Sequence, residues 1–433
     1  MIDTIVDWGA KSLKIRLKRG RMDNPTARPR THYTEALGLD TRPVSTLPYS
    51  SREYFELERE KIFKRAWLCI GRVEQLPTPD SYFVEELEFA STSVLITRLK
   101  SGAVRAFHNV CSHRSNKIVQ DSEGTTSRLI CRYHNWTYRN DGTLIGVPDE
   151  ANFFALDKSR CGLKAIACDV WDGWIFVNLQ PQPEVTLGEF LGALGEEHRG
   201  LPYPNAATPI RFSARLKTNW KVIADAFAEA YHIPAIHPKT IGPMMRNPTN
   251  LVSRPSGAWT WGPHHAYATI GKPAYAPDTR SNVERLASAG GQKFFVDEAA
   301  ATGARHPALN LARSEEWASD NTVIFPNFQI TRMSFQFVTF RFVPISYDET
   351  RWVSSFYLPE ATDVQARLQQ EYYLARNFDI LLEDVGNAES AQVGLESGAM
   401  QTMHLQDGEV MIRHALHHIQ KWIDAPSVKI ALS

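Results

Sequence analysis

The chain has 433 residues, of which 43% are hydrophobic, and acidic and basic residues are equal in number at 48 each. This length exceeds that of one ordinary domain and predicts two, with enough apolar material for two cores. The balanced charge gives no support for nucleic-acid binding, and no apolar run is long enough to span a membrane.

Cysteine usage indicates a reducing, cytoplasmic setting. The five cysteines are too few and too unevenly spaced for a disulfide framework. The amino terminus, MIDTIVDWGAKS, has no hydrophobic core followed by a cleavage site. We therefore expect no secretory signal.

Residues 1–45 precede the first predicted domain and form a basic arm. Leu13, Ile15 and Leu17 alternate with charged residues, which is an extended rather than a helical period. Residues 10–30 of the arm are basic, with Lys11, Lys14, Arg16, Lys18, Arg19, Arg21, Arg28 and Arg30. We expect the arm to be solvated or to pack on a neighbouring subunit.

Residues 46–180 are predicted to form an all-β domain that begins with one helix. The stretch SREYFELEREKIFKRAW (51–67) has the period of an amphipathic helix. Its candidate core residues are Tyr54, Phe55, Leu57, Ile62 and Phe63. From about 68 to 180, short runs such as SVLITRL, VRAFHNV and GWIFVNL alternate with Gly, Asp and Asn turns, which is typical of β-strands. Pro181 and Pro183 mark the exit from this domain.

Two short pairs of metal-ligand residues lie inside the β region. Cys111-x-His113 is followed, after seventeen residues, by Cys131-x-x-His134. Two thiolates and two imidazoles in this mixed order suit a [2Fe–2S] cluster in which one iron takes both cysteines and the other both histidines. A tetrahedral zinc site is the alternative, but zinc fingers usually keep their cysteines in one pair and their histidines in another. We therefore predict an iron–sulfur cluster, shielded by the packing of Trp136.

Residues 181–433 are predicted to form a second domain of the α+β class. Strands are expected at 211–220, 322–333, 334–345 and 351–359, and helices at 221–232, 363–395 and 408–423. Strands bounded by long helices indicate an antiparallel sheet with helices on one side. Residues 239–310, rich in Pro, Gly, Ala and Ser, are predicted to be irregular, and so long a segment in a compact domain indicates a functional lid.

The sequence NWKVIADAFAEAYHIPAIHP carries a second set of candidate metal ligands. Asp225, Glu229 and His232 recur at four- and three-residue spacing, so they are predicted to share one face of a helix. Pro234 is predicted to break that helix, so that His237 can turn toward the same metal as His232. Two histidines and one carboxylate with open positions are the ligand set of O₂-activating ferrous iron.

The two cluster loops, FHNVCSHR and CRYHNWTY, resemble those of Rieske non-haem iron oxygenases, specifically the large (α) subunit. Further motifs follow in the expected order, so that the resemblance covers about residues 45–420. Most members have glycine where this chain has Asn135, and asparagine is the other residue that readily adopts a left-handed backbone conformation. The resemblance implies an all-β Rieske domain followed by a helix-grip catalytic domain, with a [2Fe–2S] cluster and mononuclear Fe(II) as cofactors.

The resemblance also implies roles for three carboxylates. Asp384, in LLEDVGNAESAQVGLES, matches the third iron ligand of the family; Asp225 is its rival, and a capping or solvated aspartate is the plain alternative. Glu229 stands where many members have an aspartate that joins the two iron centres across subunits. Its carboxylate would link His134 of one subunit to His232 of the next, in a homotrimeric ring.

Other candidate ligands have no matched partners in the sequence. His414, His417 and His418 lie in a predicted helix and are expected to be surface or packing residues. Cys161 and Cys168 are expected to be buried small apolar residues.

The function that the resemblance implies is that of a terminal oxygenase component. NAD(P)H electrons would pass through a reductase and a ferredoxin to the cluster and then to the iron, which uses O₂ to oxidise a small molecule. Some members with glutamate at the position of Glu229 mono-oxygenate carbon next to nitrogen. We therefore expect mono-oxygenation, by hydroxylation or oxidative N- or O-dealkylation, rather than cis-dihydroxylation of an aromatic ring. A Rieske electron-transfer protein without oxygenase activity is the alternative from another class, and the second metal site argues against it.

No motif in the sequence identifies the substrate, and the residues considered for substrate binding and for docking come from the irregular segment and the arm. Tyr267, Tyr275, Phe294 and Phe295 suit an apolar, aromatic or xenobiotic substrate, or are ordinary packing residues. The basic arm is a candidate docking site for an acidic ferredoxin.

Overall fold

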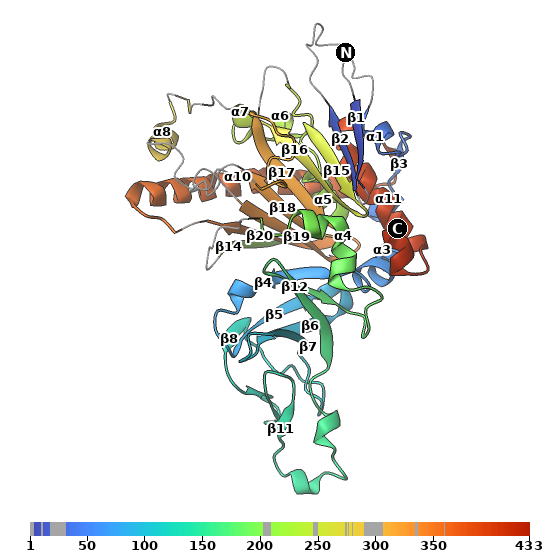
Figure 1. Ribbon diagram of the computed structural model, residues 1–433, viewed down its shortest axis with the longest axis vertical. Coiled ribbons are helices and arrows are strands. Elements are labelled where there is room, and N and C mark those ends of the chain that lie inside the picture. Colours follow the sequence, from blue (N-terminus) through green and yellow to red (C-terminus); the bar gives the residue numbers. More distant parts are fainter. Residues whose placement is uncertain are drawn as a thin grey trace. The chain divides into compact units, whose positions relative to one another are not determined.

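A computed structural model describes residues 4–9, 12–17, 32–201, 209–245, 250–272, 275, 277–278, 280–289, 306–333, 337–358 and 360–433 (Figure 1). The chain forms two compact units. The larger unit consists of Met1–Glu56, Leu191–Pro426 and Ile430–Ser433, and the smaller unit of Leu57–Phe190 and Ser427–Lys429. The chain passes between the units after residues 56, 190, 426 and 429, whereas the boundaries were predicted at 45 and 180.

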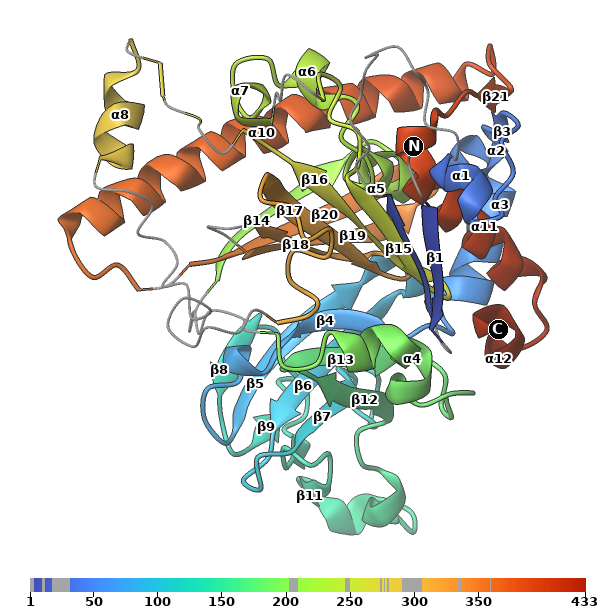
Figure 2. The same cartoon turned by 45° about the horizontal axis from the view of Figure 1, so that its top comes forward.

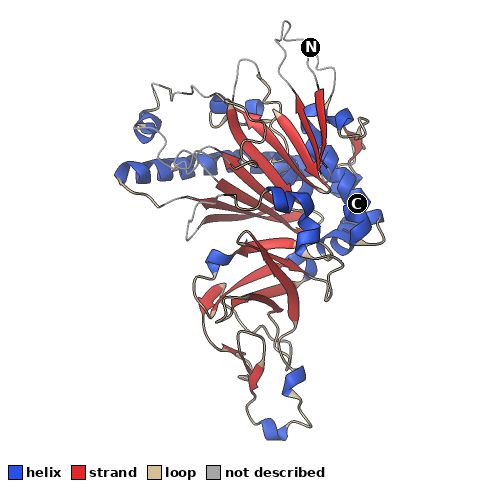
Figure 3. Ribbon diagram, viewed as in Figure 1, coloured by secondary structure: helices blue, strands red, loops and turns tan. Residues whose placement is uncertain are grey.

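Antiparallel strands and the loops between them make up most of the smaller unit (Figure 3). Seven strands form one sheet in the order β4-β13-β12-β7-β6-β5-β8, and three form a second sheet in the order β11-β10-β9. The first sheet contains β4 Leu68–Arg72, β5 Ser81–Leu87, β6 Thr92–Arg98, β7 Val104–His108, β8 Glu123–Thr125, β12 Ala165–Trp171 and β13 Trp174–Asn178. The second sheet contains β9 Leu129–Ile130, β10 Thr137–Tyr138 and β11 Leu144–Gly146. The prediction of an all-β domain is confirmed.

The amphipathic helix predicted before the β region is present in a modified form. It runs as α3 over Arg52–Glu58 and continues as a π-helical turn over Arg59–Phe63. Phe55 and Ile62 are buried, as predicted, whereas Leu57 is 44% exposed and is not a core residue. Residues two apart on a helix point to nearly opposite sides, so Phe55 and Leu57 cannot both face the core.

The larger unit is built on one nine-stranded antiparallel sheet. Its order is β1-β2-β15-β16-β17-β18-β19-β20-β14. Its strands are β1 Thr4–Gly9, β2 Ser12–Leu17, β14 Ile210–Leu216, β15 Gly257–Trp261, β16 His264–Ile270, β17 Trp317–Ile324, β18 Phe328–Met333, β19 Phe337–Ser346 and β20 Glu349–Tyr357. The strand pair β3 Val44–Ser45 and β21 Thr402–Met403 lies apart from this sheet.

Helices accompany this sheet, and the longest, α10, runs along one of its faces (Figure 2). Within the residues that the structure describes, the α-helices besides α3 are α1 Tyr33–Ala36, α2 Leu47–Ser50, α4 Leu187–Glu197, α5 Trp220–Ala226, α6 Ile233–Ile236, α7 Gly242–Met245, α8 Asn282–Ser288, α10 Val364–Glu396, α11 Val410–Asp424 and α12 Val428–Leu432. The two long helices predicted near the carboxyl end are confirmed as α10 and α11. No helix in the described ranges is long and apolar enough to cross a membrane.

The face of α10 that meets the sheet is marked by Leu374, Leu381 and Ala388, which recur every seven residues. They share one buried cluster with Phe342 and Trp352 of neighbouring strands. A seven-residue repeat keeps side chains on one stripe of a helix. This packing fixes both the position and the rotation of α10, and hence the direction of the polar side chains next to the stripe.

The region predicted to be irregular, 239–310, contains two central strands of the sheet. β15 and β16 are joined at Gly262, whose φ is +57°. Every residue of β16 is buried. A strand buried on both faces shows no alternation of polar and apolar residues, so the period-2 signal was missing. The prediction of a structureless segment is therefore wrong for 257–270, and Tyr267 lies on a strand.

The extended period predicted at Leu13, Ile15 and Leu17 is confirmed, since β2 pairs with β1 and with β15. Most of the other positions named for the arm and the lid lie outside the described residues: Lys11, Lys18, Arg19, Arg21, Arg28, Arg30, Phe294 and Phe295.

Candidate functional site

The four predicted cluster ligands come from two loops of the smaller unit that repeat one hydrogen-bonding pattern. In each loop the cysteine N–H donates to the carbonyl oxygen five residues later. Cys111 N lies 2.8 Å from the oxygen of Asn116, and Cys131 N lies 2.9 Å from that of Trp136. The residue four positions after each cysteine donates back to the cysteine carbonyl. The two loops are therefore equivalent turns, although His113 stands two residues after its cysteine and His134 three.

Each loop turns back at a residue with left-handed backbone conformation. These residues are Ser115, with φ +59°, and Asn135, with φ +57°. Asn135 occupies the position where a left-handed conformation was predicted, so that prediction is confirmed. Its N–H donates to the carbonyl oxygen of Cys131 at 2.8 Å.

The donor atoms at this site fit a [2Fe–2S] cluster. Cys111 and Cys131 are buried, and the ring centroids of His113 and His134 lie 4.6 Å apart. Nδ1 of His113 is buried and has no hydrogen-bond partner among the described residues. A buried imidazole nitrogen without a partner is costly unless it binds a metal. The ring of His113 stacks on Trp136 at 4.9 Å, consistent with the predicted packing of that residue.

Tyr138, which the sequence analysis did not single out, contacts one of the predicted ligand sulfurs. Its Oη lies 3.3 Å from Sγ of Cys111 and accepts a hydrogen bond from the N–H of Ser112 at 3.1 Å. Burial raises the pKa of Tyr138 well above its usual range, so the hydroxyl keeps its proton. Because its oxygen already accepts from Ser112, its hydrogen is available to a Cys111 thiolate.

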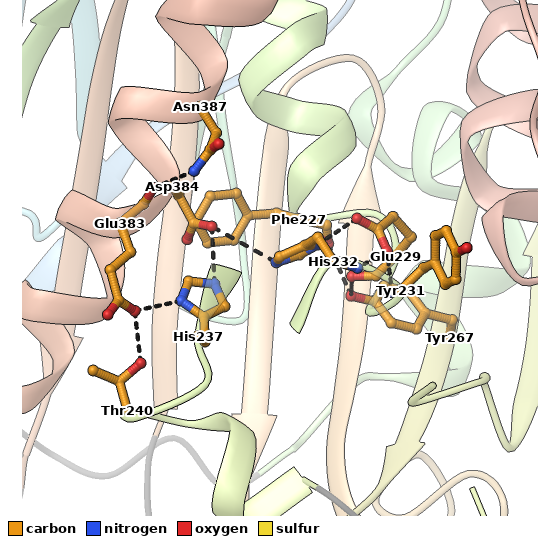
Figure 4. A network of polar contacts seen from close by, with 10 residues as sticks. All are labelled: Phe227, Glu229, Tyr231, His232, His237, Thr240, Tyr267, Glu383, Asp384 and Asn387. Atoms are coloured by element: carbon orange, nitrogen blue, oxygen red, sulfur yellow. Dashed lines mark hydrogen bonds and ion pairs between the residues drawn. The ribbon is translucent and has the colours of Figure 1, made fainter. Parts of the chain in front are cut away.

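In the larger unit, His232, His237 and Asp384 bring one ligand atom each to within 4.8 Å of the others (Figure 4). Nε2 of His237 lies 3.0 Å from Oδ1 of Asp384, and Nε2 of His232 lies 3.6 Å from the same oxygen. His237 and Asp384 are almost fully buried. Two imidazoles and one carboxylate around a single point fit one iron ion with open positions.

The local structure that brings the two histidines together differs from the prediction. Helix α5 ends at Ala226, so Asp225, Glu229 and His232 do not share a helix face. Pro234 does not break a helix; it lies in the first turn of α6, where a missing N–H costs nothing. His232 and His237 flank this single short helix at its two ends.

A glutamate holds the second nitrogen of each histidine. Nδ1 of His232 is paired with Oε1 of Glu229, whose other oxygen accepts the backbone N–H groups of Tyr231 and His232. Nδ1 of His237 lies 2.6 Å from Oε2 of Glu383. Such partners fix the tautomer and orientation of a ligating imidazole and direct Nε2 to the metal.

No sequence motif indicated a role for Glu383 or for Thr240, which contacts it. Oε2 of Glu383 also accepts the hydroxyl of Thr240 at 2.6 Å. Glu383 directly precedes Asp384 on α10, and this adjacency was the only available signal.

Asp225, the rival ligand, has a different environment. Its Oδ2 accepts the hydroxyl of Tyr49 at 2.6 Å, and it lines a separate cavity of about 30 Å³ together with Lys221 and His265. It is not part of the three-residue group formed by the described residues. Burial raises the pKa of Asp225 to about 7.

A cavity of about 110 Å³ lies beside His232, His237 and Asp384. Its remaining wall combines Phe227 and Phe340, whose rings are 4.5 Å apart, with aliphatic side chains and a polar strip on the sheet. Roughly 10–15 Å³ of this kind of volume holds one water. The cavity therefore has room for a small organic molecule beside the candidate metal position.

Two of the three histidines of α11, His414 and His418, pack in the interior, whereas His417 is exposed. Nδ1 of His414 lies 3.1 Å from Nδ1 of His265, and His418 is also buried. Burial lowers the pKa of His414 and of His418, so both stay neutral. Cys161 packs against the apolar core around the cluster loops, and Cys168 is partly buried.

The family of the chain follows from matches to both units. Residues 66–166 match the Rieske [2Fe-2S] domain, and residues 205–425 match the ring hydroxylating alpha subunit (catalytic domain). The chain belongs to the ring-hydroxylating alpha subunit family. The two matched domains imply a Rieske cluster and a mononuclear iron.

Curated relatives of the chain include several oxygenase subunits. It is 33% identical over 197 residues to the glycine betaine monooxygenase oxygenase subunit of Pseudomonas aeruginosa, which is 45% of this chain and 44% of that protein. It is 30% identical over 193 residues to the carnitine monooxygenase oxygenase subunit of Acinetobacter pittii, which is 44% of this chain and 51% of that protein. The chain thus spans about half the length of these relatives. A chloroplastic choline monooxygenase of Beta vulgaris is 24% identical over 387 residues, which is 88% of this chain and 76% of that protein.

Solved structures with the same fold include oxygenases of two kinds. A quaternary ammonium Rieske monooxygenase in complex with L-carnitine has a TM-score of 0.64 at 19% identity, covering 87% of this chain and 95% of that one. Naphthalene 1,2-dioxygenase from Rhodococcus bound to indole has a TM-score of 0.72 at 21% identity, covering 89% and 95%. At this identity the likeness establishes the fold: an all-β Rieske domain and a catalytic domain with an antiparallel sheet and helices.

Proposed function

We propose that this protein is the terminal oxygenase component of a multicomponent Rieske system and that it mono-oxygenates a small organic molecule. One observation carries the proposal: His232, His237 and Asp384 surround a single point at the wall of a cavity. The cluster loops of Cys111 and Cys131 lie in the same chain. A Rieske protein that only carries electrons needs no second metal site beside a cavity, so the electron-transfer alternative is disfavoured.

In this proposal Cys111, His113, Cys131 and His134 hold the [2Fe–2S] cluster, and His232, His237 and Asp384 hold Fe(II). When bound, these groups supply electrons and the activation of O₂. The protein's own residues orient the ligands. Glu229 and Glu383 hold the Nδ1 atoms of the two histidines, so each imidazole presents Nε2.

Glu229 has a further role in the proposed assembly. Its carboxylate would join His232 to His134 of a neighbouring subunit in a homotrimer, so that electrons cross between subunits. Electrons would reach the cluster from NAD(P)H through a reductase and a ferredoxin in the cytoplasm. The proposed domains are 46–180 for the cluster and 181–433 for catalysis, preceded by the arm.

The substrate class is narrowed by the relatives and by the cavity. Glycine betaine, carnitine and choline, named for the relatives, are quaternary ammonium compounds. The faces of Phe227 and Phe340 can contact a quaternary ammonium group by cation–π attraction. The same faces could contact an apolar aromatic body, as expected from the sequence. We place quaternary ammonium compounds first, because those relatives are monooxygenases and because Glu229 favours mono-oxygenation.

A substrate screen tests the proposed reaction. Protein with both iron centres loaded would be supplied with NAD(P)H, a surrogate reductase and a ferredoxin, and offered choline, glycine betaine, carnitine and indole. Mass spectrometry should find a product with one added oxygen, or one that has lost an alkyl group as aldehyde, and His237→Ala should give neither. A cis-diol formed from indole would show that the protein dihydroxylates aromatic rings rather than mono-oxygenating its substrate. An absence of O₂-dependent products from every compound, with both centres loaded, would contradict the proposal.

A further inference from the structure

A strip of polar side chains crosses three strands in the wall of the active-site cavity. The strip consists of Thr269 on β16, Ser319 and Asn321 on β17, and Gln329 and Thr331 on β18, all of them buried. All except Gln329 line the cavity that also contains His232, His237 and Asp384. Buried polar groups in an otherwise apolar wall are costly, so the strip requires an explanation.

Strand register places these residues side by side on one face of the sheet. Ser319 pairs with Thr269 on one neighbouring strand, and Asn321 pairs with Thr331 on the other. Residues two apart on a strand point to the same face. Asn321 therefore lies between Ser319 and Thr331 along the cavity wall, and Thr322 points to the opposite face.

Hydrogen bonds connect the five side chains into one chain. Thr269 Oγ1 and Ser319 Oγ are 2.8 Å apart, and Asn321 Nδ2 donates to Ser319 Oγ at 2.9 Å. Thr331 Oγ1 donates to Asn321 Oδ1 at 2.9 Å. Gln329 Nε2 ends the chain by donating to Thr331 Oγ1 at 3.2 Å and to the carbonyl oxygen of Phe227 at 3.1 Å.

The strip holds more hydrogens than these bonds use. The two amides carry two N–H hydrogens each and the three hydroxyls one O–H hydrogen each, whereas the contacts just described are five bonds. Two polar hydrogens therefore remain. Reversing the Asn321 amide changes which atoms donate but leaves this surplus unchanged, whereas reversing the Gln329 amide would lose its bond to the carbonyl oxygen of Phe227 and so increase the surplus. A buried donor without an acceptor is costly, so a molecule in the cavity must supply acceptors.

The rest of the wall limits what such a molecule can be. No lysine or arginine occurs among the described residues that line the cavity. Of its carboxylates, Glu229 is paired with His232, and Asp384 belongs to the candidate metal set. Apart from the strip and the metal side, the lining is mainly aromatic and aliphatic. Surplus donors thus face a largely apolar chamber beside the metal.

We propose that the strip centred on Asn321 and Ser319 is the recognition site for a hydrogen-bond-accepting oxygen of the substrate, whose alkyl or aromatic body lies against Phe227 and Phe340. The inference rests on the proposed function, because it concerns the substrate of that same cavity. It assigns the substrate to molecules that carry a carboxylate, carbonyl or alcohol oxygen at one end. An unsubstituted hydrocarbon or a bare tetraalkylammonium ion would leave the surplus donors without acceptors.

Binding to the anaerobic protein, with both iron centres loaded, tests the proposal without turnover. Isothermal titration would compare glycine betaine with tetramethylammonium and indan-1-one with indane, so that each pair differs in its oxygen group. In at least one pair, the oxygen-bearing member should bind about tenfold more tightly, which corresponds to one well-made hydrogen bond to a buried donor. The betaine pair tests a carboxylate acceptor, and the indanone pair tests a neutral carbonyl.

Asn321→Leu and Ser319→Ala should each reduce that preference to within about threefold. Thr322→Val is the matched control, since Thr322 is buried on the same strand but points to the other face, and it should keep the preference. Ser319→Ala keeps the test decisive if Asn321→Leu does not fold. Equal binding within both pairs, no binding of any of the four compounds, or an unchanged preference in both variants would overturn the proposal. Failure of the oxygenase function would instead appear as missing O₂-dependent product with the binding preference intact.

Discussion

The imidazole of His237 is hydrogen-bonded to Glu383, with 2.6 Å between Nδ1 and Oε2. Its other nitrogen faces Asp384, the next residue on α10. One turn of one helix therefore supplies both a candidate iron ligand and the group that orients a second ligand. The apolar stripe that seats α10 on the sheet fixes both carboxylates at once.

Removing Glu383 should weaken iron binding at the mononuclear site. In Glu383→Ala, His237 loses the acceptor that fixes its tautomer, and we expect iron affinity to fall about 10- to 100-fold. Competition with a chelator measures this affinity. Asn387→Ala is the control, because Asn387 is exposed one turn later and its side-chain amide donates to the backbone oxygen of Glu383 rather than to its carboxylate. Equal affinity in Glu383→Ala and wild type would show that the contact does not orient His237.

Tyr138→Phe should lower the reduction potential of the cluster. A hydrogen bond to a ligand sulfur offsets negative charge on the cluster and so favours reduction. A bond of about 1 kcal/mol corresponds to a shift on the order of tens of millivolts for one electron. Spectroelectrochemical titration measures the potential. Tyr82→Phe, in the same buried core, is the control; equal shifts in both variants would contradict the role of Tyr138.

Asn135 should tolerate glycine but not a β-branched residue. Its φ of +57° costs glycine nothing but costs other residues about 1–2 kcal/mol, and most for branched side chains. Asn135→Gly should therefore keep the cluster, while Asn135→Val should unfold more easily and lose cluster. Thermal unfolding and the visible absorption of the cluster measure both effects. A fully loaded, equally stable Asn135→Val would show that the loop does not depend on this conformation.

The cluster loops could be predicted because their chemistry is local in sequence. The residues from Cys111 to Asn116 and from Cys131 to Trp136 form two turns, each closed by hydrogen bonds across a few residues. The spacing of the cysteines and histidines was therefore sufficient to predict the loops. The long helices α10 and α11 were also predictable from their period and length. The same holds for Asn135, whose conformation depends on its own side chain rather than on distant contacts.

The parts that the sequence did not predict depend on contacts distant along the chain. Thr240 meets Glu383 from 143 residues away, and no local pattern indicates such a pair. The end of α5 at Ala226 was missed because 221–232 has good helical spacing, whereas the observed chain turns there and Glu229 binds backbone N–H groups. The strand β16 was missed because burial on both faces removes its alternation.

Asp225→Asn should change how stability depends on pH. Burial raises the pKa of Asp225 from 3.8 to about 7, although the hydrogen bond from Tyr49 and the charge of Lys221 act to lower it. The folded chain therefore binds this proton more tightly than the unfolded chain. The contribution of Asp225 to the free energy of unfolding therefore falls as the pH rises from about 4 to 7. The fall is at most ~1.4 kcal/mol per pH unit and is complete above pH 7.

Asparagine does not titrate, so Asp225→Asn should gain stability relative to wild type between pH 5 and pH 8. Urea unfolding at the two pH values measures this difference. Asp424→Asn removes the same charge from an exposed side chain of α11 and serves as the control. If the free energy of unfolding of Asp225→Asn differs from that of wild type by the same amount at both pH values, the pKa of Asp225 is not raised in the folded chain.

In the proposed function, His232, His237 and Asp384 hold a mononuclear iron separate from the cluster. The most direct test is the iron and acid-labile sulfide content of Asp384→Ala. Loaded wild type should contain about three irons and two sulfides per chain, and Asp384→Ala about two irons and two sulfides. Asp379→Ala, which removes an exposed carboxylate from the same helix, should match wild type. Retention of the third iron in Asp384→Ala would show that Asp384 is not an iron ligand, and zinc without sulfide in wild type would show that the chain holds no Rieske cluster.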